Sequence, residues 1–202
     1  MLATASLKPV ARVPTQPAAR PYTLIVPTAD VLALVQQLVY TDSGRAYPCR
    51  NNPACASWGQ DLALSAPTLT VEGARLVATT HVTGTYAISQ FFEPEVSGDL
   101  HISATPVVAG NMIHLSDTKI EPGPGDVTFR AFIEAAHAHM EQLLDQRATF
   151  DLAQYLSLAS RDPRLPPPRL PGVRNIDASQ VTVESVATQV GPPAVVATVS
   201  VR

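Results

Sequence analysis

The chain has 202 residues, of which 46% are hydrophobic and 15% charged, and its formal net charge is −3. That length suits one domain with its own core, and without a basic run or interleaved aromatic and basic residues nucleic-acid binding has no electrostatic basis. No stretch approaches the roughly 20 apolar residues that span a bilayer. Residues 1–21 are rich in Pro and Ala and lack the apolar core of a secretory signal, so we interpret them as a flexible lead and residues 22–202 as one domain.

The domain is predicted to open with a short strand and a short helix. Residues 22–26 have the composition of a strand, and Thr28 is predicted to cap the helix that follows. Apolar residues then recur at helical spacing from Val31 to Val39, and Gly44 marks the end of the segment. The pattern therefore predicts an amphipathic helix directly after the first strand.

The two cysteines, Cys49 and Cys55, flank an Asn-Asn-Pro turn in the next segment. A zinc clip would need further ligands nearby, and a redox pair usually has the C-x-x-C spacing, so neither is favoured. A turn of this kind can bring two cysteines to disulfide distance, where closing the loop would stabilise the fold by about 2–2.5 kcal/mol. We interpret the pair as a disulfide, with two free buried thiols as the alternative. A disulfide favours a periplasmic or secreted location, and a cytoplasmic one is left open.

From residue 60 onward the apolar pattern changes to a period of two, which is typical of half-buried strands. Turns are expected at Gly73 and around Gly110, and the residues "PGPGD" are predicted to break the sheet. Long alternating strands joined by short turns predict an antiparallel meander with one face on a core. Strands are predicted within residues 61–71, 74–89, 95–108 and 111–121.

A long amphipathic helix is predicted after the meander, within residues 126–150, with Asp126 as its N-cap. A second short helix follows a cap at Asp151, residues 161–172 form a proline-rich extended connector, and a last hairpin turns at Gly191-Pro192. The apolar stripe of the long helix consists of Phe129, Phe132, Ile133, Ala136, Met140, Leu143 and Leu144.

The five histidines raise the question of metal or catalytic chemistry. A hairpin turning at Ala109-Gly110 would place His114 near Thr105 and His101 near Thr118, which keeps these two histidines apart along the sheet. With no acid or cysteine at ligand spacing, no metal site is predicted. The strand histidines, including His81, are interpreted as exposed, and His137 and His139 as residues at the boundary of the helical stripe.

No pattern of a nucleophilic enzyme is present, neither G-x-S-x-G nor H-E-x-x-H. Asp99, His101 and Ser103 alternate along one strand face, where neighbours lie about 7 Å apart, too far for direct hydrogen bonds between short side chains. The chain is therefore expected not to be an enzyme, with no catalytic residue and no cofactor.

The order of elements resembles a single half-module of the tubular lipid-binding superfamily, which includes the bactericidal/permeability-increasing-like proteins and synaptotagmin-like lipid-transfer domains. The nearest resemblance is to bacterial envelope domains of unknown function, and it covers roughly Tyr22 to Arg202. It implies an α+β fold in which a long curved antiparallel sheet wraps around one long amphipathic helix, with short additional helices. The residues that carry it are Val96, Gly98, Leu100, Ile102, Pro106, Ile113, Leu115, Asp117, Ile120, Asp151, Leu152 and Leu156.

In such a fold an apolar seam between helix and sheet either closes as core or admits a hydrocarbon chain. The sequence and the resemblance together predict an extracytoplasmic module that holds a lipid or other hydrophobic ligand in this seam. The alternative is a structural or assembly protein with a closed core that acts through protein–protein contacts. A homodimer and a peripheral membrane contact are left open. The expected ligand contacts are Leu100, Ile102, Ile113, Leu115, Phe132, Ile133, Ala136 and Met140.

Overall fold

The fold was taken from a computed structural model, which describes residues 19–39, 43–46, 62–85, 93–165, 168–170 and 172–202. Both cysteines, Cys49 and Cys55, lie outside these ranges. The elements, in chain order, are β1 (Arg20–Pro27), α1 (Thr28–Val39), β2 (Arg45–Ala46), β3 (Ala63–Glu72), β4 (Arg75–Thr85), β5 (Glu95–Ala109), β6 (Met112–Gly125), α2 (Val127–Arg147), β7 (Thr149–Phe150), α3 (Leu152–Arg161), a 3₁₀ turn (Ala178–Gln180), β8 (Val181–Gln189) and β9 (Ala194–Val201).

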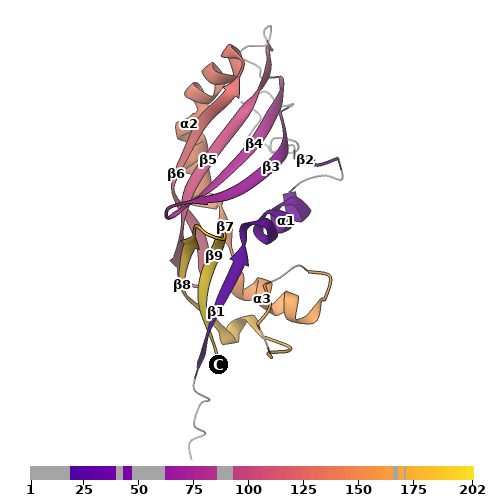
Figure 1. Cartoon of the computed structure of the whole chain (residues 1–202), viewed down its shortest axis with the longest axis vertical. Coiled ribbons are helices and arrows are strands. Elements are labelled where there is room, and N and C mark those ends of the chain that lie inside the picture. The colour runs from indigo at the N-terminus through magenta and orange to yellow at the C-terminus, as the bar shows by residue number, and fades with distance from the viewer. Residues whose placement is uncertain (1–18, 40–42, 47–61, 86–92, 166–167, 171) are drawn as a thin grey trace, which may run out of the picture.

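The strands form two antiparallel sheets, and the fold is α+β as predicted. The larger sheet is curled and has the order β2-β3-β4-β5-β6-β7, with α2 beside it (Figure 1). The smaller sheet has the order β1-β9-β8 and lies at the other end of the molecule, next to α3 (Figure 1). The two sheets belong to two separate clusters of buried apolar side chains.

The meander is confirmed: β3, β4, β5 and β6 pair in order, each antiparallel to the next. The register predicted across the hairpin of β5 and β6 is wrong. His114 pairs with Val107, and His101 pairs with Glu121. The turn consists of Gly110 and Asn111, which shifts the register by two residues, and a bulge between Ser103 and Thr105 shifts it by one more.

The prediction that "PGPGD" breaks the sheet is also wrong, because β6 continues through these residues to Gly125. Pro122 pairs with Leu100 and Gly125 with Gly98. Proline is tolerated in an edge strand where its nitrogen points away from the partner strand. The glycines leave room for an aromatic ring, since a Cβ at Gly98 would come within 2.3 Å of the Phe129 side chain.

The long helix α2 is confirmed with its predicted cap, since the side chain of Asp126 accepts a hydrogen bond from the backbone N–H of Phe129. The helix runs back along β6 and returns the chain to β7, which pairs with the other end of β6. A sheet that wraps around this helix is not what the structure shows: α2 packs mainly beside β6, at one side of the sheet (Figure 1).

The smaller sheet joins the two ends of the described chain. Strand β9 lies in the centre and pairs with β8 through the predicted closing hairpin and with β1 on its other side. Leu24 and Val199, from β1 and β9, are buried on the face that α3 covers. Helix α3 begins at its predicted cap, where the side chain of Asp151 accepts a hydrogen bond of 2.8 Å from the N–H of Gln154.

Candidate functional site

The eight residues predicted to contact a ligand in the seam do not all lie together in the structure. Four of them form a closed core under α2, with exposed fractions of 6% for Leu100, 5% for Phe132, 1% for Ile133 and 8% for Ala136. They pack together with the fully buried Phe129 in one cluster. This end of the seam is filled by side chains and leaves no room for a ligand.

The other end of the seam is more open. Ile102 and Met140 pack against the same cluster but are only half-buried, as is Leu144. Leu115 is half-buried on β6. Apolar side chains from β5, β6 and the last turns of α2 are thus left partly exposed. The eighth residue, Ile113, belongs elsewhere, since it packs against the second cluster beside α3.

The opposite face of the large sheet carries a polar cluster that the sequence analysis did not bring together. Nδ1 of His81 lies 2.8 Å from Oδ1 of Asp99, and Nε2 of the same ring lies 3.4 Å from Oγ of Ser97. His81 is on β4, and the two other residues are on β5. The antiparallel register of β4 and β5 brings these side chains together, because His81 pairs directly with Asp99 and every second residue of a strand lies on the same face of the sheet.

The order Ser97–His81–Asp99 is that of the hydrolytic serine triad, so its surroundings decide what it can do. The side chains of His81 and Asp99 are 40% and 39% exposed, so water screens the pair. The backbone N–H of Ser97 donates to Oδ2 of Asp126 at 2.8 Å and is therefore unable to stabilise an oxyanion. The geometry fits a cross-strand pair that fixes the sheet better than it fits a nucleophile.

Two further contacts extend this polar face. His101 lies 3.1 Å from the hydroxyl of Thr79, and Arg75 reaches across β5 to bind Ser103 and Asp117. Asp117 has a positive φ of 52° at the bulge of β6, so the guanidinium of Arg75 holds that bulge in place. Within the described residues, no three His, Cys, Asp or Glu side chains gather closely enough to hold a metal ion.

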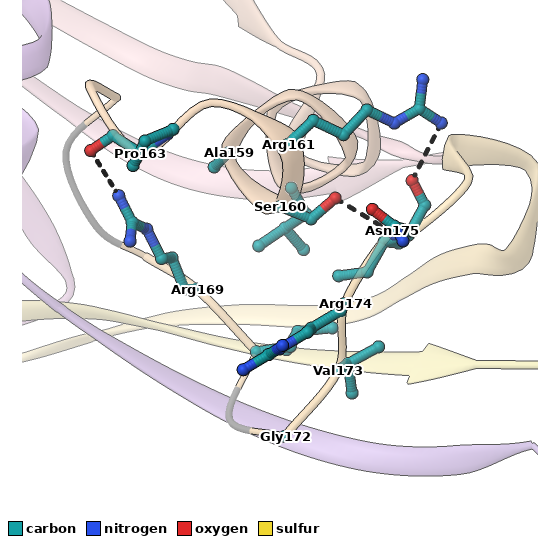
Figure 2. Close-up of a pocket in the computed structure, with 12 residues that line it drawn as sticks. Ala159, Ser160, Arg161, Pro163, Arg169, Gly172, Val173, Arg174 and Asn175 are labelled. Carbon is teal, nitrogen blue, oxygen red and sulfur yellow. Dashed lines mark hydrogen bonds between the residues drawn. The ribbon is translucent and has the colours of Figure 1, made fainter.

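A cavity lies at the other end of the molecule, between α3 and the chain that leads to β8. Its volume is about 390 Å³. Its floor is apolar and buried, since Leu156, Leu170 and Ile176 are at most 3% exposed. Ser160 and Ile176 hold the two walls together, because the hydroxyl of Ser160 accepts a hydrogen bond of 3.1 Å from the N–H of Ile176 (Figure 2).

Three exposed arginines, Arg161, Arg169 and Arg174, line the rim of this cavity. Arg169 donates to the carbonyls of Pro163 and Leu165, at 2.8 Å and 3.0 Å. In Figure 2 the side chain of Arg169 extends toward Pro163, that of Arg174 extends toward Gly172, and that of Arg161 turns toward the carbonyl of Ile176.

The charge of the rim also acts on its neighbours. Burial raises the pKa of the Tyr155 hydroxyl on α3, and the positive charge of Arg169 opposes that rise. The hydroxyl and N–H of Ser179 lower the pKa of Asp177, and the charge of Arg161 contributes in the same direction. The cavity therefore combines an apolar floor with a positive rim.

Comparisons of the chain with protein-family models, with curated proteins and with solved structures gave no match. The resemblance to the tubular lipid-binding superfamily therefore stays a prediction. None of the described helices is both long enough and apolar enough to cross a membrane.

Proposed function

We propose that the protein is an extracytoplasmic, non-enzymatic module that holds a lipid or another hydrophobic ligand at the half-open end of the seam between α2 and the large sheet. The observation that carries this proposal is the group of half-buried apolar side chains around Ile102 and Met140. Contiguous apolar surface that stays partly exposed is typical of ligand grooves and of interaction surfaces.

The closed end of the seam supports this placement. Phe129 and Ile133 anchor the first turns of α2 in the core, whereas Met140 and Leu144 in its later turns are only half-buried. An acyl chain lying along Ile102 and Met140 would remove their remaining surface from water, which is favourable by about 25 cal/mol per Å². The ligand thus completes a core that the chain leaves unfinished at one end.

Two substitutions, one on each face of β5, test whether the ligand lies in the seam. Ile102→Asn puts an amide into the half-open seam, whereas Val107→Asn changes a residue that is 37% exposed on the opposite face of β5. We expect the first variant to bind a fluorescent fatty acid at least about tenfold more weakly than wild type, because an unpaired amide in an apolar groove costs about 1–3 kcal/mol. Equal binding by both variants would contradict the proposal.

The rival proposal, an assembly protein with a closed core, is favoured by one observation. Four of the eight predicted contact residues are at most 8% exposed. Native purification followed by mass spectrometry of extracted lipids separates the two proposals. Co-purified lipid supports the binding module, whereas a concentration-dependent dimer without lipid supports the assembly protein.

The non-enzymatic part of the proposal has its own test at Ser97. Because its N–H is bound by Asp126 and His81 is exposed, we expect p-nitrophenyl acetate to be hydrolysed no faster by the wild-type protein than by the Ser97→Ala variant. A burst of nitrophenol that disappears in this variant would show that Ser97 is a nucleophile.

A further inference from the structure

The cavity beside α3 has a chemistry that neither the seam nor the core requires. Residues 161–176 contain four arginines and only one acid, Asp162, in a chain whose net charge is −3. Asp162 is not at the cavity wall; its carboxylate accepts a hydrogen bond from the N–H of Arg164. Within the described part of the chain, no carboxylate forms an ion pair with Arg161, Arg169 or Arg174.

The three guanidinium groups differ in what already engages them. Arg169 is bound to two backbone carbonyls of its own loop, and Arg161 contacts the carbonyl of Ile176 at 3.5 Å. The guanidinium of Arg174 donates no hydrogen bond to another described residue. Guanidinium groups bind carboxylates and phosphates through two parallel N–H donors, so Arg174 retains its full capacity for an anion, and Arg169 retains part of its own.

The apolar floor of the cavity also restricts which ligand would fit. Leu156, Leu170 and Ile176 are buried, and half-buried Val173 lies beside them in the lining. A volume of about 390 Å³ lies within the range of small-molecule sites. A bare inorganic anion would leave the apolar floor uncovered, whereas a molecule with an acidic group and a short hydrocarbon part would satisfy both surfaces.

We propose that this cavity binds a small amphiphile through its phosphate or carboxylate group, with Arg174 holding the anion and the floor of Leu156, Leu170 and Ile176 holding the apolar part. The site is separate from the seam: it is built by α3 and by residues of the other apolar cluster. This proposal can therefore be tested independently of the lipid groove proposed above.

The test compares three probes on the full chain by titration followed with NMR of backbone amides. Octyl phosphate carries both parts of the proposed ligand, octyl maltoside lacks the charge, and inorganic phosphate lacks the hydrocarbon. We expect octyl phosphate to bind at least about tenfold more tightly than either of the others, because charge-assisted contacts and apolar burial both contribute. The amide shifts should centre on Gly172, Val173 and Ile176.

Two matched variants locate the anion. Arg174→Gln removes the unengaged guanidinium, and we expect it to weaken octyl phosphate binding about tenfold. Arg164→Gln removes an exposed arginine of the same segment that does not line the cavity, and it should leave the affinity unchanged. Among the described residues Arg174 has no hydrogen-bond or ion-pair partner, so we expect an unchanged urea midpoint, which would show that the loss is one of binding.

Each other result has one meaning. If inorganic phosphate binds as tightly as octyl phosphate, and this binding is lost in Arg174→Gln, the cavity is a site for a free anion and the proposed binding of an amphiphile is wrong. Octyl maltoside that binds as tightly as octyl phosphate, or equal effects of the two arginine variants, overturns the proposal. Amide shifts that centre on Ile102 and Met140 would place the probe in the seam. They would contradict the proposal for the cavity and agree with the proposed lipid groove.

Discussion

At the scale of single residues, the clearest constraint is the contact between two glycines and one aromatic ring. A Cβ at Gly98 would lie 2.3 Å from the Phe129 ring, and one at Gly125 would lie 2.8 Å from it. Phe129 is fully buried, so its ring has no free space to move into. The first turn of α2 reaches the sheet only because these two strand positions carry no side chain.

This contact predicts a specific coupling. Gly98→Ala should destabilise the protein by about 1–3 kcal/mol, because an extra methyl group overpacks a filled core. In a Phe129→Leu background, where the ring is gone, the same substitution should cost clearly less. The free energy of unfolding by urea, measured for all four members of this double-mutant cycle, gives the coupling. Additive effects of the two substitutions would show that the cost of Gly98→Ala does not come from a clash with the Phe129 ring.

A second prediction at this scale concerns Asp177, which caps the 3₁₀ turn before β8. The hydroxyl of Ser179, at 2.7 Å, is the largest cause of the lowered pKa of this carboxyl. Ser179→Ala should therefore raise the pKa of Asp177 toward its ordinary value, as seen by NMR titration of the carboxyl carbon, while Ser185→Ala should leave it in place.

The sign of the pH effect follows from the lowered pKa. The unfolded chain has the ordinary aspartate pKa of about 3.9, so the carboxylate contributes its full stabilisation above that value. The contribution is lost as the pH falls through the lower pKa of the folded state. The difference in unfolding temperature between wild type and Ser179→Ala should therefore be constant from about pH 5 upward and shrink in more acidic solution.

At the scale of elements, the edge of β6 that β7 leaves unpaired explains why α2 lies where it does. Its backbone donors are satisfied one after another: Ile120 by the carboxylate of Glu141, Thr118 by that of Asp145, and Leu115 by the carbonyl of Ala148. Pro122 has no donor to satisfy. A strand edge with free N–H groups is a site for aggregation, and here the helix covers it with acceptors.

Removing one of these acceptors should have a measurable cost. Glu141→Ala leaves the N–H of Ile120 without a partner, which is expected to lower the free energy of unfolding by about 1–3 kcal/mol. Hydrogen exchange of the Ile120 amide should become faster than in wild type. Glu134→Ala, an exposed residue on the same helix, is the matched control and should change the stability by less than about 0.5 kcal/mol. An equal effect of both variants would rule out this role of Glu141.

The elements whose signals are local were predicted well from the sequence. The caps Asp126 and Asp151 and the alternation along β5 depend on neighbours within a few residues. The continuation of β6 through Pro122 was missed, because it depends on which edge of the strand faces a partner. The pair of His81 with Asp99 was missed for a related reason, since only the register between β4 and β5 brings them together.

At the scale of the whole molecule, sequence patterns could not show that the chain builds two sheets and two apolar clusters. Strand β9 pairs with β1, from the other end of the described chain, and no local pattern specifies that contact. The cavity beside α3 was missed because its floor comes from α3 and from a segment interpreted as a connector. The candidate seam was predicted as a stripe of side chains, but the closure of one end depends on packing against Gly98 and Gly125.

The side chain of Asn111, in the turn between β5 and β6, links the large sheet to the small one. Its amide donates to the carbonyl of Val181 at 2.9 Å, and its oxygen accepts from the N–H of Val183 at 2.7 Å. A single side chain thus pairs with the edge of β8 in the way that a neighbouring strand would. A second bridge, from the hydroxyl of Thr188 to the carbonyl of Gly73, is exposed.

This arrangement predicts how the molecule unfolds. Asn111→Ala leaves two backbone groups of β8 without their partner, and the loss should be about 1–3 kcal/mol, because Asn111 is half-buried. Thr188→Ala removes the exposed bridge and should change the stability by less than about 0.5 kcal/mol. If Asn111 couples the two sheets, calorimetry should show one cooperative transition in the wild-type protein and a broader or divided transition in Asn111→Ala. A transition that moves to lower temperature without broadening would mean that the sheets are coupled through other contacts between β5 and β8.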